Sequence, residues 1–176
     1  MKRADRLLRV WRFSRARAHV AGTVLDIGCH DGTFLASFPA HRRLGVDVKI
    51  PSHAHAPWLL ESSLTQMNLS ERYQTITCLA TYEHLAADER PSFWSVVQQH
   101  LTQEGQLVMT VPHRWVDEIL RIGKALGVLS GMEDHQHSDV NETELIADAH
   151  RHQLRLERLE RFQLGLNRLF VFRRCA

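Results

Sequence analysis

Short apolar runs alternate with helical patterns along most of the chain. Runs typical of buried strands cover residues 23–27, 43–48, 57–61, 74–80 and 106–111. Helical spacing is expected between them at 33–38 and 88–101, and again after the last of them at 116–126. Strands that alternate with helices predict βαβ units, and therefore a mainly parallel sheet with helices on both faces.

The last third of the chain departs from this alternation. Asn141 is expected to cap a helix over 142–151, with Glu144 at the capping-box position. Two strands follow at 154–162 and 167–173, joined through Gly165, and we expect them to form an antiparallel hairpin at one edge of the sheet. No linker or break in composition divides residues 1–176, so the sequence predicts a single α/β domain with a seven-stranded sheet.

Residues 3–19 predict an amphipathic helix ahead of the first strand. Its apolar residues, which alternate with arginines, are Leu7, Leu8, Val10, Trp11 and Phe13. We expect the apolar face to pack on the domain and the basic face to lie in solvent. Two alternatives stay open, because an Arg-rich and acid-poor helix also suits an organelle transit peptide or weak contact with a membrane surface.

Composition narrows the class of protein. With 176 residues, of which 44% are hydrophobic and 24% charged, the chain has the profile of a soluble globular domain. Cys29, Cys78 and Cys175 are widely spaced, which excludes a disulfide framework and a four-thiolate zinc site and indicates a reducing, cytoplasmic compartment. No apolar run approaches the roughly 18 residues that a membrane-spanning helix requires.

The net charge of +2 conceals an uneven distribution. Residues 1–20 contain seven Lys or Arg and one acid, residues 151–176 contain seven Arg and two Glu, and the centre is acidic. A domain that binds nucleic acid normally spreads one basic face over its surface. The distribution therefore predicts no nucleic-acid partner.

The residues that carry chemistry are concentrated in the segment Asp26-Ile27-Gly28-Cys29-His30-Asp31-Gly32. A glycine turn here joins a predicted strand to a helical pattern, a place where backbone can approach a ligand closely. Asp47 ends the next predicted strand, where an acid is positioned to bond ribose hydroxyls. Because a carboxylate in the loop would repel a pyrophosphate, the segment favours a cationic ligand.

Residues 22–174 resemble the class I S-adenosylmethionine-dependent methyltransferases, particularly the methyltransferase type 11 group. Residues 24–32 match the family's first motif, hydrophobic-Asp/Glu-x-Gly-x-Gly-x-Gly, except at His30, where a glycine is expected. Residues 44–47 look like the second motif, and 81–85 resemble the Glu-His-hydrophobic signature after the fourth strand. Residues 101–112 and 161–167 resemble the segment that enters the fifth strand and the terminal hairpin. The resemblance implies a Rossmann-like class I methyltransferase fold.

The resemblance also implies how S-adenosylmethionine would be held. Gly28 and Gly32 would let its methionine part lie against the backbone, and Asp26 would orient its ammonium group. Asp47 would accept both ribose hydroxyls, and Val48 would pack on the adenine. The complete implied set of cofactor-binding residues is Asp26, Gly28, Cys29, Gly32, Asp47, Val48, Ser63, Leu64 and Leu79.

The last three members of this set complete the cofactor contacts. Ser63 and Leu64 follow the third predicted strand, where the family contacts the adenine edge, and serine replaces the usual acid. Leu79 lies where a main-chain carbonyl would meet the amino group of the cofactor.

Methyl transfer from a sulfonium is an in-line displacement, so position and desolvation supply most of the catalysis. A general base is needed only if the acceptor is a hydroxyl or a protonated nitrogen. The candidate bases are Glu83, His84, His113, His135 and His137. We favour His113 and His135 over His84, because they lie on loops over the expected acceptor cavity. The pairs His53/His55 and His135/His137 have metal-like spacing, but no metal site is expected.

These features predict an S-adenosylmethionine-dependent methyltransferase with a small-molecule acceptor. Residues 1–20, 50–60 and 112–140 would build the acceptor pocket, with the first helix as part of a lid near the cofactor. One alternative is a methyltransferase-like binding or scaffold module without turnover. A nicotinamide-dependent oxidoreductase is disfavoured by Asp26 and by the spacing of the glycines.

Overall fold

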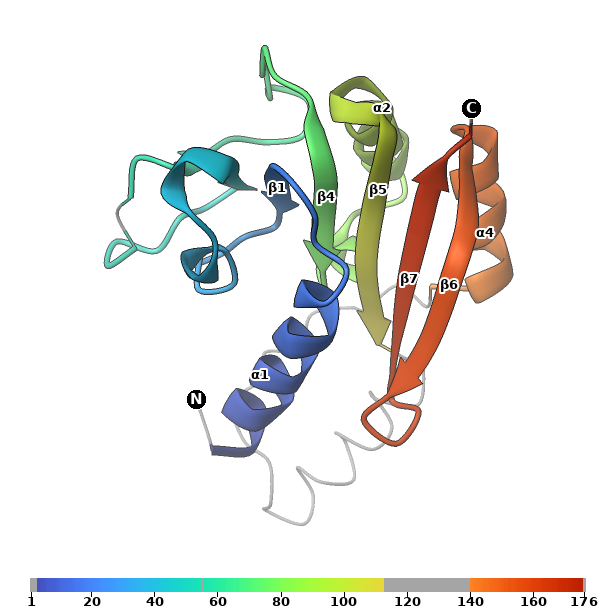
Figure 1. Cartoon of the computed structure of the whole chain (residues 1–176), viewed down its shortest axis with the longest axis horizontal. Coiled ribbons are helices and arrows are strands. Elements are labelled where there is room, and N and C mark those ends of the chain that lie inside the picture. Colours follow the sequence, from blue (N-terminus) through green and yellow to red (C-terminus); the bar gives the residue numbers. More distant parts are fainter. Residues whose placement is uncertain (1–2, 55, 113–139, 176) are drawn as a thin grey trace.

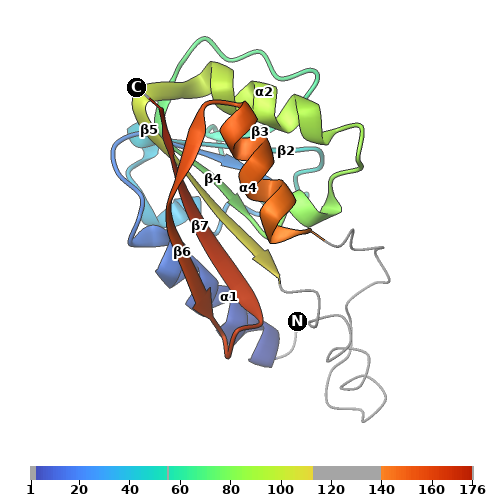
Figure 2. The same cartoon turned by 90° about the vertical axis from the view of Figure 1, so that its right-hand side faces the viewer.

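The computed structural model describes residues 3–54, 56–112 and 140–175, which form one twisted sheet covered on both faces (Figures 1 and 2). The described strands are β1 (Val24–Ile27), β2 (Arg43–Asp47), β3 (Leu59–Glu61), β4 (Tyr73–Leu79), β5 (Leu101–Pro112), β6 (Leu154–Phe162) and β7 (Asn167–Arg174). They make a seven-stranded sheet with the order β3-β2-β1-β4-β5-β7-β6. Only β7 runs antiparallel to its neighbours, β5 and β6, so the predicted mainly parallel sheet with a terminal hairpin is confirmed.

Three described α-helices cover this sheet. Helices α2 (Arg90–His100) and α4 (Glu142–Arg151) lie on one face, and α1 (Arg3–Arg17) crosses the other (Figures 1 and 2). The face under α2 and α4 holds an aromatic core in which Tyr82, Phe93 and Trp94 meet edge to face, and the Trp94 indole donates to the Tyr82 hydroxyl at 3.2 Å. None of the described helices is long and apolar enough to cross a membrane.

The segment after β1 differs from its prediction. In place of one helix over 33–38, the chain forms two short 3₁₀ helices, η1 (Leu35–Ser37) and η2 (Ala40–Arg42). Phe38, between them, is extended, with φ −108° and ψ 156°. The residue before a proline is disfavoured in the α region, so Pro39 ends the helical turn after three residues.

The orientation of α1 also differs from its prediction. Leu7, Val10 and Trp11 are exposed, whereas the face toward the sheet carries Ala16 and the half-buried Arg12. The helix packs beside an acidic loop instead of a wholly apolar surface, which gives inward arginines favourable neighbours. The expectation of a buried apolar face and a solvated basic face is therefore wrong for the first half of the helix.

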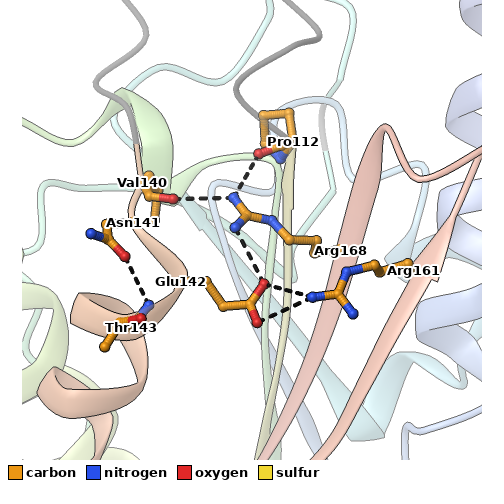
Figure 3. Close-up of polar contacts among 7 residues, drawn as sticks. All are labelled: Pro112, Val140, Asn141, Glu142, Thr143, Arg161 and Arg168. Atoms are coloured by element: carbon orange, nitrogen blue, oxygen red, sulfur yellow. Dashed lines mark hydrogen bonds and ion pairs between the residues drawn. The ribbon is translucent and has the colours of Figure 1, made fainter.

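One buried arginine on β7 joins the end of β5 to the start of α4. Arg168 donates to the carbonyl oxygens of Pro112 at 3.0 Å and Val140 at 3.1 Å (Figure 3). Its guanidinium also lies 3.5 Å from a carboxylate oxygen of Glu142. The Glu142 carboxylate accepts two hydrogen bonds from Arg161, each at 3.3 Å. Arg168 thus fixes two elements that are far apart in sequence.

The predicted cap of α4 is present beside this cluster. The Asn141 side chain accepts a hydrogen bond from the Thr143 backbone N–H at 2.9 Å (Figure 3). The donor is the amide of Thr143, one residue before the capping-box position Glu144. Asn141 is therefore the N-cap, as expected, with its bond shifted by one residue.

Replacing Arg168 should destabilise the fold. Arg168→Met leaves two carbonyl oxygens without this donor and removes one of the two arginines that contact Glu142, and we expect the free energy of unfolding to fall by about 3–5 kcal/mol. Arg173 is the matched control on the same strand, because it contacts Glu157 at 3.0 Å and a backbone carbonyl but is partly exposed. Arg173→Met should cost less than about 1 kcal/mol. Urea unfolding of both variants measures the difference, and equal losses would contradict the assigned role of Arg168.

Candidate functional site

The loop after β1 is fastened to the end of β2 by three backbone amides. The N–H groups of Gly28 and Cys29 donate to the Val46 carbonyl at 2.8 and 3.2 Å. The N–H of His30 donates to Oδ2 of Asp47 at 2.8 Å. The loop therefore bends over the carboxyl ends of two parallel strands, where ligands of open α/β sheets bind.

Three positions of this loop have left-handed backbone conformations. Gly28 has φ +78°, His30 +48° and Gly32 +68°. A Cβ at Gly28 would lie 2.2 Å from Oγ1 of Thr81, so the first glycine is required for the close approach of these two loops. A non-glycine residue at such a φ costs on the order of 1–2 kcal/mol. His30 adopts the conformation that favours the family's glycine, with its side chain largely in solvent.

Asp26 is the buried acid at the foot of the loop. It lies on β1, and in the parallel register its neighbour on β4 is Thr77. The Thr77 hydroxyl donates to Oδ1 of Asp26 at 2.6 Å. The pKa of Asp26 is raised to about 7: burial raises it most, the Thr77 hydrogen bond lowers it, and the nearby charge of Asp47 raises it. A cation placed beside this carboxyl would relieve the cost of ionising it.

Asp47 ends β2, and its carboxylate binds backbone amides of the loop after β1 and of the segment that follows β2. Its Oδ2 accepts from His30, and its Oδ1 accepts from the N–H of Lys49 at 3.1 Å. The carbonyl oxygen of Asp47 also accepts from the N–H of Ser62 at 2.8 Å, which joins the end of β3 to the site. Each carboxylate oxygen retains acceptor capacity, so Asp47 can also bind hydroxyl groups.

A third acid in the loop links it to α1. Asp31 accepts from Nη1 of Arg9 at 3.2 Å and from the N–H of Thr33 at 3.0 Å. Burial would raise the pKa of Asp31, but the hydrogen bonds from Thr33 and Arg9 outweigh it and lower that pKa. The Phe13 and Phe34 rings also meet, with centroids 5.2 Å apart. The inner face of α1 therefore packs directly on this loop.

The other predicted cofactor residues fall into two groups. Val48 is exposed directly after Asp47, and Leu79 ends β4, two strands away. The side chains of Cys29 and Leu79 are buried in one core, so only their backbones are available to a ligand, and Leu64 is partly buried against the other core. Ser63 lies after β3, where its hydroxyl is 3.2 Å from that of Thr65.

The predicted catalytic histidines are mostly beyond what the structure describes. His84 is exposed on η3 (Tyr82–His84), directly after buried Glu83. His113 and His135 lie outside the described residues, as does His137. Within the described ranges, no group of three or more His, Cys, Asp or Glu side chains is placed to hold a metal ion.

Three residues of the site were missed by sequence reasoning. Thr77 is recognisable only when β1 and β4 are known to be neighbours, and Thr81 only when its contact with Gly28 is seen. Arg12 lies on the inner face of α1, with its Nε buried and without a hydrogen-bond partner among the described residues. Burial lowers the pKa of Arg12, although the charge of Glu83 raises it. Arg12 therefore brings a positive charge near the acid that follows β4.

The comparisons with known proteins support the fold. No protein-family model matches the sequence, and no curated protein matches it either, so the type 11 assignment stays a prediction. An S-adenosylmethionine-dependent methyltransferase from Clostridium acetobutylicum is 13% identical with a TM-score of 0.72, covering 98% of this chain and 96% of that one.

Two further solved structures are similar over most of the chain. Magnesium protoporphyrin IX methyltransferase from Synechocystis, with SAH bound, is 14% identical with a TM-score of 0.68 over 99% of this chain and 88% of that one. A 1,6-didemethyltoxoflavin-N1-methyltransferase from Burkholderia thailandensis, with 1,6-didemethyltoxoflavin and S-adenosylhomocysteine bound, is 16% identical with a TM-score of 0.65, covering 94% of this chain and 77% of that one. At these identities the likeness concerns the fold, and the chain has the fold of the class I methyltransferases.

Proposed function

We propose that this protein transfers a methyl group from S-adenosylmethionine to a small-molecule acceptor. The observation that carries the proposal is the pairing of buried Asp26 with Asp47 around a loop whose amides are already fastened to β2. This arrangement is acidic where the cofactor has a positive ammonium and sulfonium, and it offers acceptors where the cofactor has ribose hydroxyls. Gly28 lets the loop after β1 approach Thr81, which brings the carboxyl ends of β1 and β4 together at the proposed site.

Each proposed residue would contact a different part of the cofactor. Asp26 orients the ammonium group, Asp47 accepts from the ribose hydroxyls, and Val48 packs on the adenine. The backbones at Gly28 and Gly32 face the methionine part. The remaining proposed contacts are the backbones of Cys29, Leu64 and Leu79 and the hydroxyl of Ser63.

The bound cofactor supplies an activated methyl group on a sulfonium. The protein then has to position an acceptor in line with that methyl and exclude water from it. The similar solved proteins named for a porphyrin and for didemethyltoxoflavin support an acceptor that is a small molecule. His113, His135 and His84 stay the proposed bases for a hydroxyl or protonated nitrogen acceptor.

Two assays test the proposal. Isothermal titration should show binding of S-adenosylmethionine and no binding of NAD. Transfer of a radiolabelled methyl group to members of a metabolite panel should then be measurable. Binding without transfer to any acceptor would favour a module without turnover, and absence of binding would overturn the proposal.

Asp26→Asn should separate the stability of the fold from affinity for the cofactor. Folding raises the pKa of Asp26 from 3.8 to about 7, so the free energy of unfolding falls as pH rises between those values and is lowest above them. The variant has no proton to lose, and at pH 8 it should be more stable than the natural protein by roughly 2–4 kcal/mol. Near pH 4 the difference should vanish. Thermal unfolding across this range, without ligand, measures it.

The same variant should bind S-adenosylmethionine less well. Loss of the charge facing the ammonium should raise the dissociation constant roughly 10- to 100-fold at pH 8. A variant that is both less stable at pH 8 and unchanged in affinity would remove Asp26 from the proposed role.

Asp47→Ala should weaken cofactor binding more strongly. It removes two hydrogen bonds to ribose and frees the His30 amide, so the dissociation constant should rise roughly 30- to 1000-fold. Asp47→Asn keeps an acceptor oxygen for His30 and should give a smaller rise, which separates loss of charge from loss of loop shape. The control is Asp148→Ala. Asp148 lies on α4, on the face of the sheet opposite α1, and its carboxylate contacts Arg151 of the same helix. Equal affinity in Asp47→Ala and Asp148→Ala would contradict the assignment.

A further inference from the structure

The outward face of α1 is apolar. Leu7 is 70% exposed, Val10 57% and Trp11 42%, and their spacing of three and four residues places them on one side of the helix. Leu8, at the border of this face, is also exposed. Exposing a contiguous apolar stripe to water is unfavourable for a monomer, and such patches mark interaction sites.

The turn between β6 and β7 extends this apolar face. Leu164, within the turn, is 97% exposed. The Gln163 side chain donates to the Leu8 carbonyl at 2.7 Å, and the Trp11 and Phe162 rings meet with centroids 6.4 Å apart. Figure 2 shows the turn beside the N-terminal half of α1, in agreement with this hydrogen bond. We call the combined surface the α1 patch: Leu7, Leu8, Val10, Trp11 and Leu164.

Cations border the α1 patch. Arg6, Arg15 and Arg17 are exposed on α1, and Arg161 is exposed at the end of β6. Two of these cations have an acidic neighbour: Arg15 lies 3.9 Å from Glu160, which is also 3.3 Å from His19, and Arg161 lies 3.3 Å from Glu142. The first 20 residues hold seven Lys or Arg against one acid, so the surroundings of the patch are strongly positive.

We propose that the α1 patch docks on the surface of an anionic lipid bilayer. A helix with Leu and Trp on one side and arginines at the borders can insert its apolar side among acyl chains while the arginines meet lipid phosphates. Charge distinguishes this occupant from a second copy of the chain, because a two-fold contact through the patch would bring the same arginines together. This proposal does not depend on the proposed function.

Docking would also orient the rest of the molecule. The inner face of α1 binds the loop after β1 through Arg9 and Asp31, so the helix separates that loop from the bilayer by its own thickness. The carboxyl end of β5 and the turn that carries Leu164 lie at the same end of the sheet (Figure 1). The docked protein therefore turns this end of the sheet toward the lipid.

Vesicle sedimentation tests the docking. The full-length protein should pellet with vesicles of phosphatidylglycerol and phosphatidylcholine, and weakly with phosphatidylcholine alone. Leu7→Ser combined with Leu164→Asn should lower the partition coefficient about tenfold, because two exposed apolar side chains are lost from the inserted surface. Asparagine suits position 164, where φ is +58°, so the fold should be unaffected. Leu60→Ser, exposed on the far edge strand β3, is the matched control and should bind like the natural protein.

A charge variant completes the design. Arg6→Gln combined with Arg17→Gln should reduce binding severalfold at low salt and much less at high salt, where lipid charge is screened. Circular dichroism and melting temperature confirm that each variant is folded. No pelleting with anionic vesicles would overturn the proposal, as would equal pelleting of the Leu7/Leu164 variant and Leu60→Ser. A dimer in solution that the Leu7/Leu164 variant disperses would instead assign the patch to self-association.

Discussion

A carboxyl group buried inside the sheet sets the conditions for the rest of the site. Asp26 stands on a central strand with Gly45 of β2 on one side and Thr77 of β4 on the other. Neither neighbour brings a positive charge, and the one hydrogen bond from Thr77 does not offset the burial, so the pKa of Asp26 is raised to about 7. An acid kept at this cost in the folded protein is expected at a binding site, where a ligand can supply the missing charge.

The loop above Asp26 gains its shape from the same two strands. Val46 and Asp47 accept three of its amides, and this fastening lets His30 occupy a conformation that glycine would adopt more easily. The loop therefore keeps a left-handed turn at position 30 with a histidine in place of glycine. Helix α1 packs on this loop through its inward arginines, so its leucines and its tryptophan are exposed to solvent.

The strands, and the acids at their ends, could be predicted from the sequence. Continuous apolar runs and the position of Asp47 are local features, and both agree with the structure. The pairing of Asp26 with Thr77 could not be predicted, because it depends on which strands become neighbours. The orientation of α1 was predicted wrongly for a related reason: periodicity finds an apolar face but does not say that the surface under the helix is acidic. Pro39 is evident in the sequence, but it shortens the predicted helix over 33–38 to a single 3₁₀ turn at Leu35–Ser37.

Proton release on cofactor binding is the most direct measure of the role assigned to Asp26. Titration of S-adenosylmethionine at pH 7 in buffers of different ionisation enthalpy gives the number of protons exchanged. Since the pKa of Asp26 is about 7 without ligand and a bound ammonium would lower it, binding should release on the order of half a proton that Asp26→Asn does not release. Identical proton exchange in both proteins would contradict the placement of the cofactor's ammonium beside Asp26.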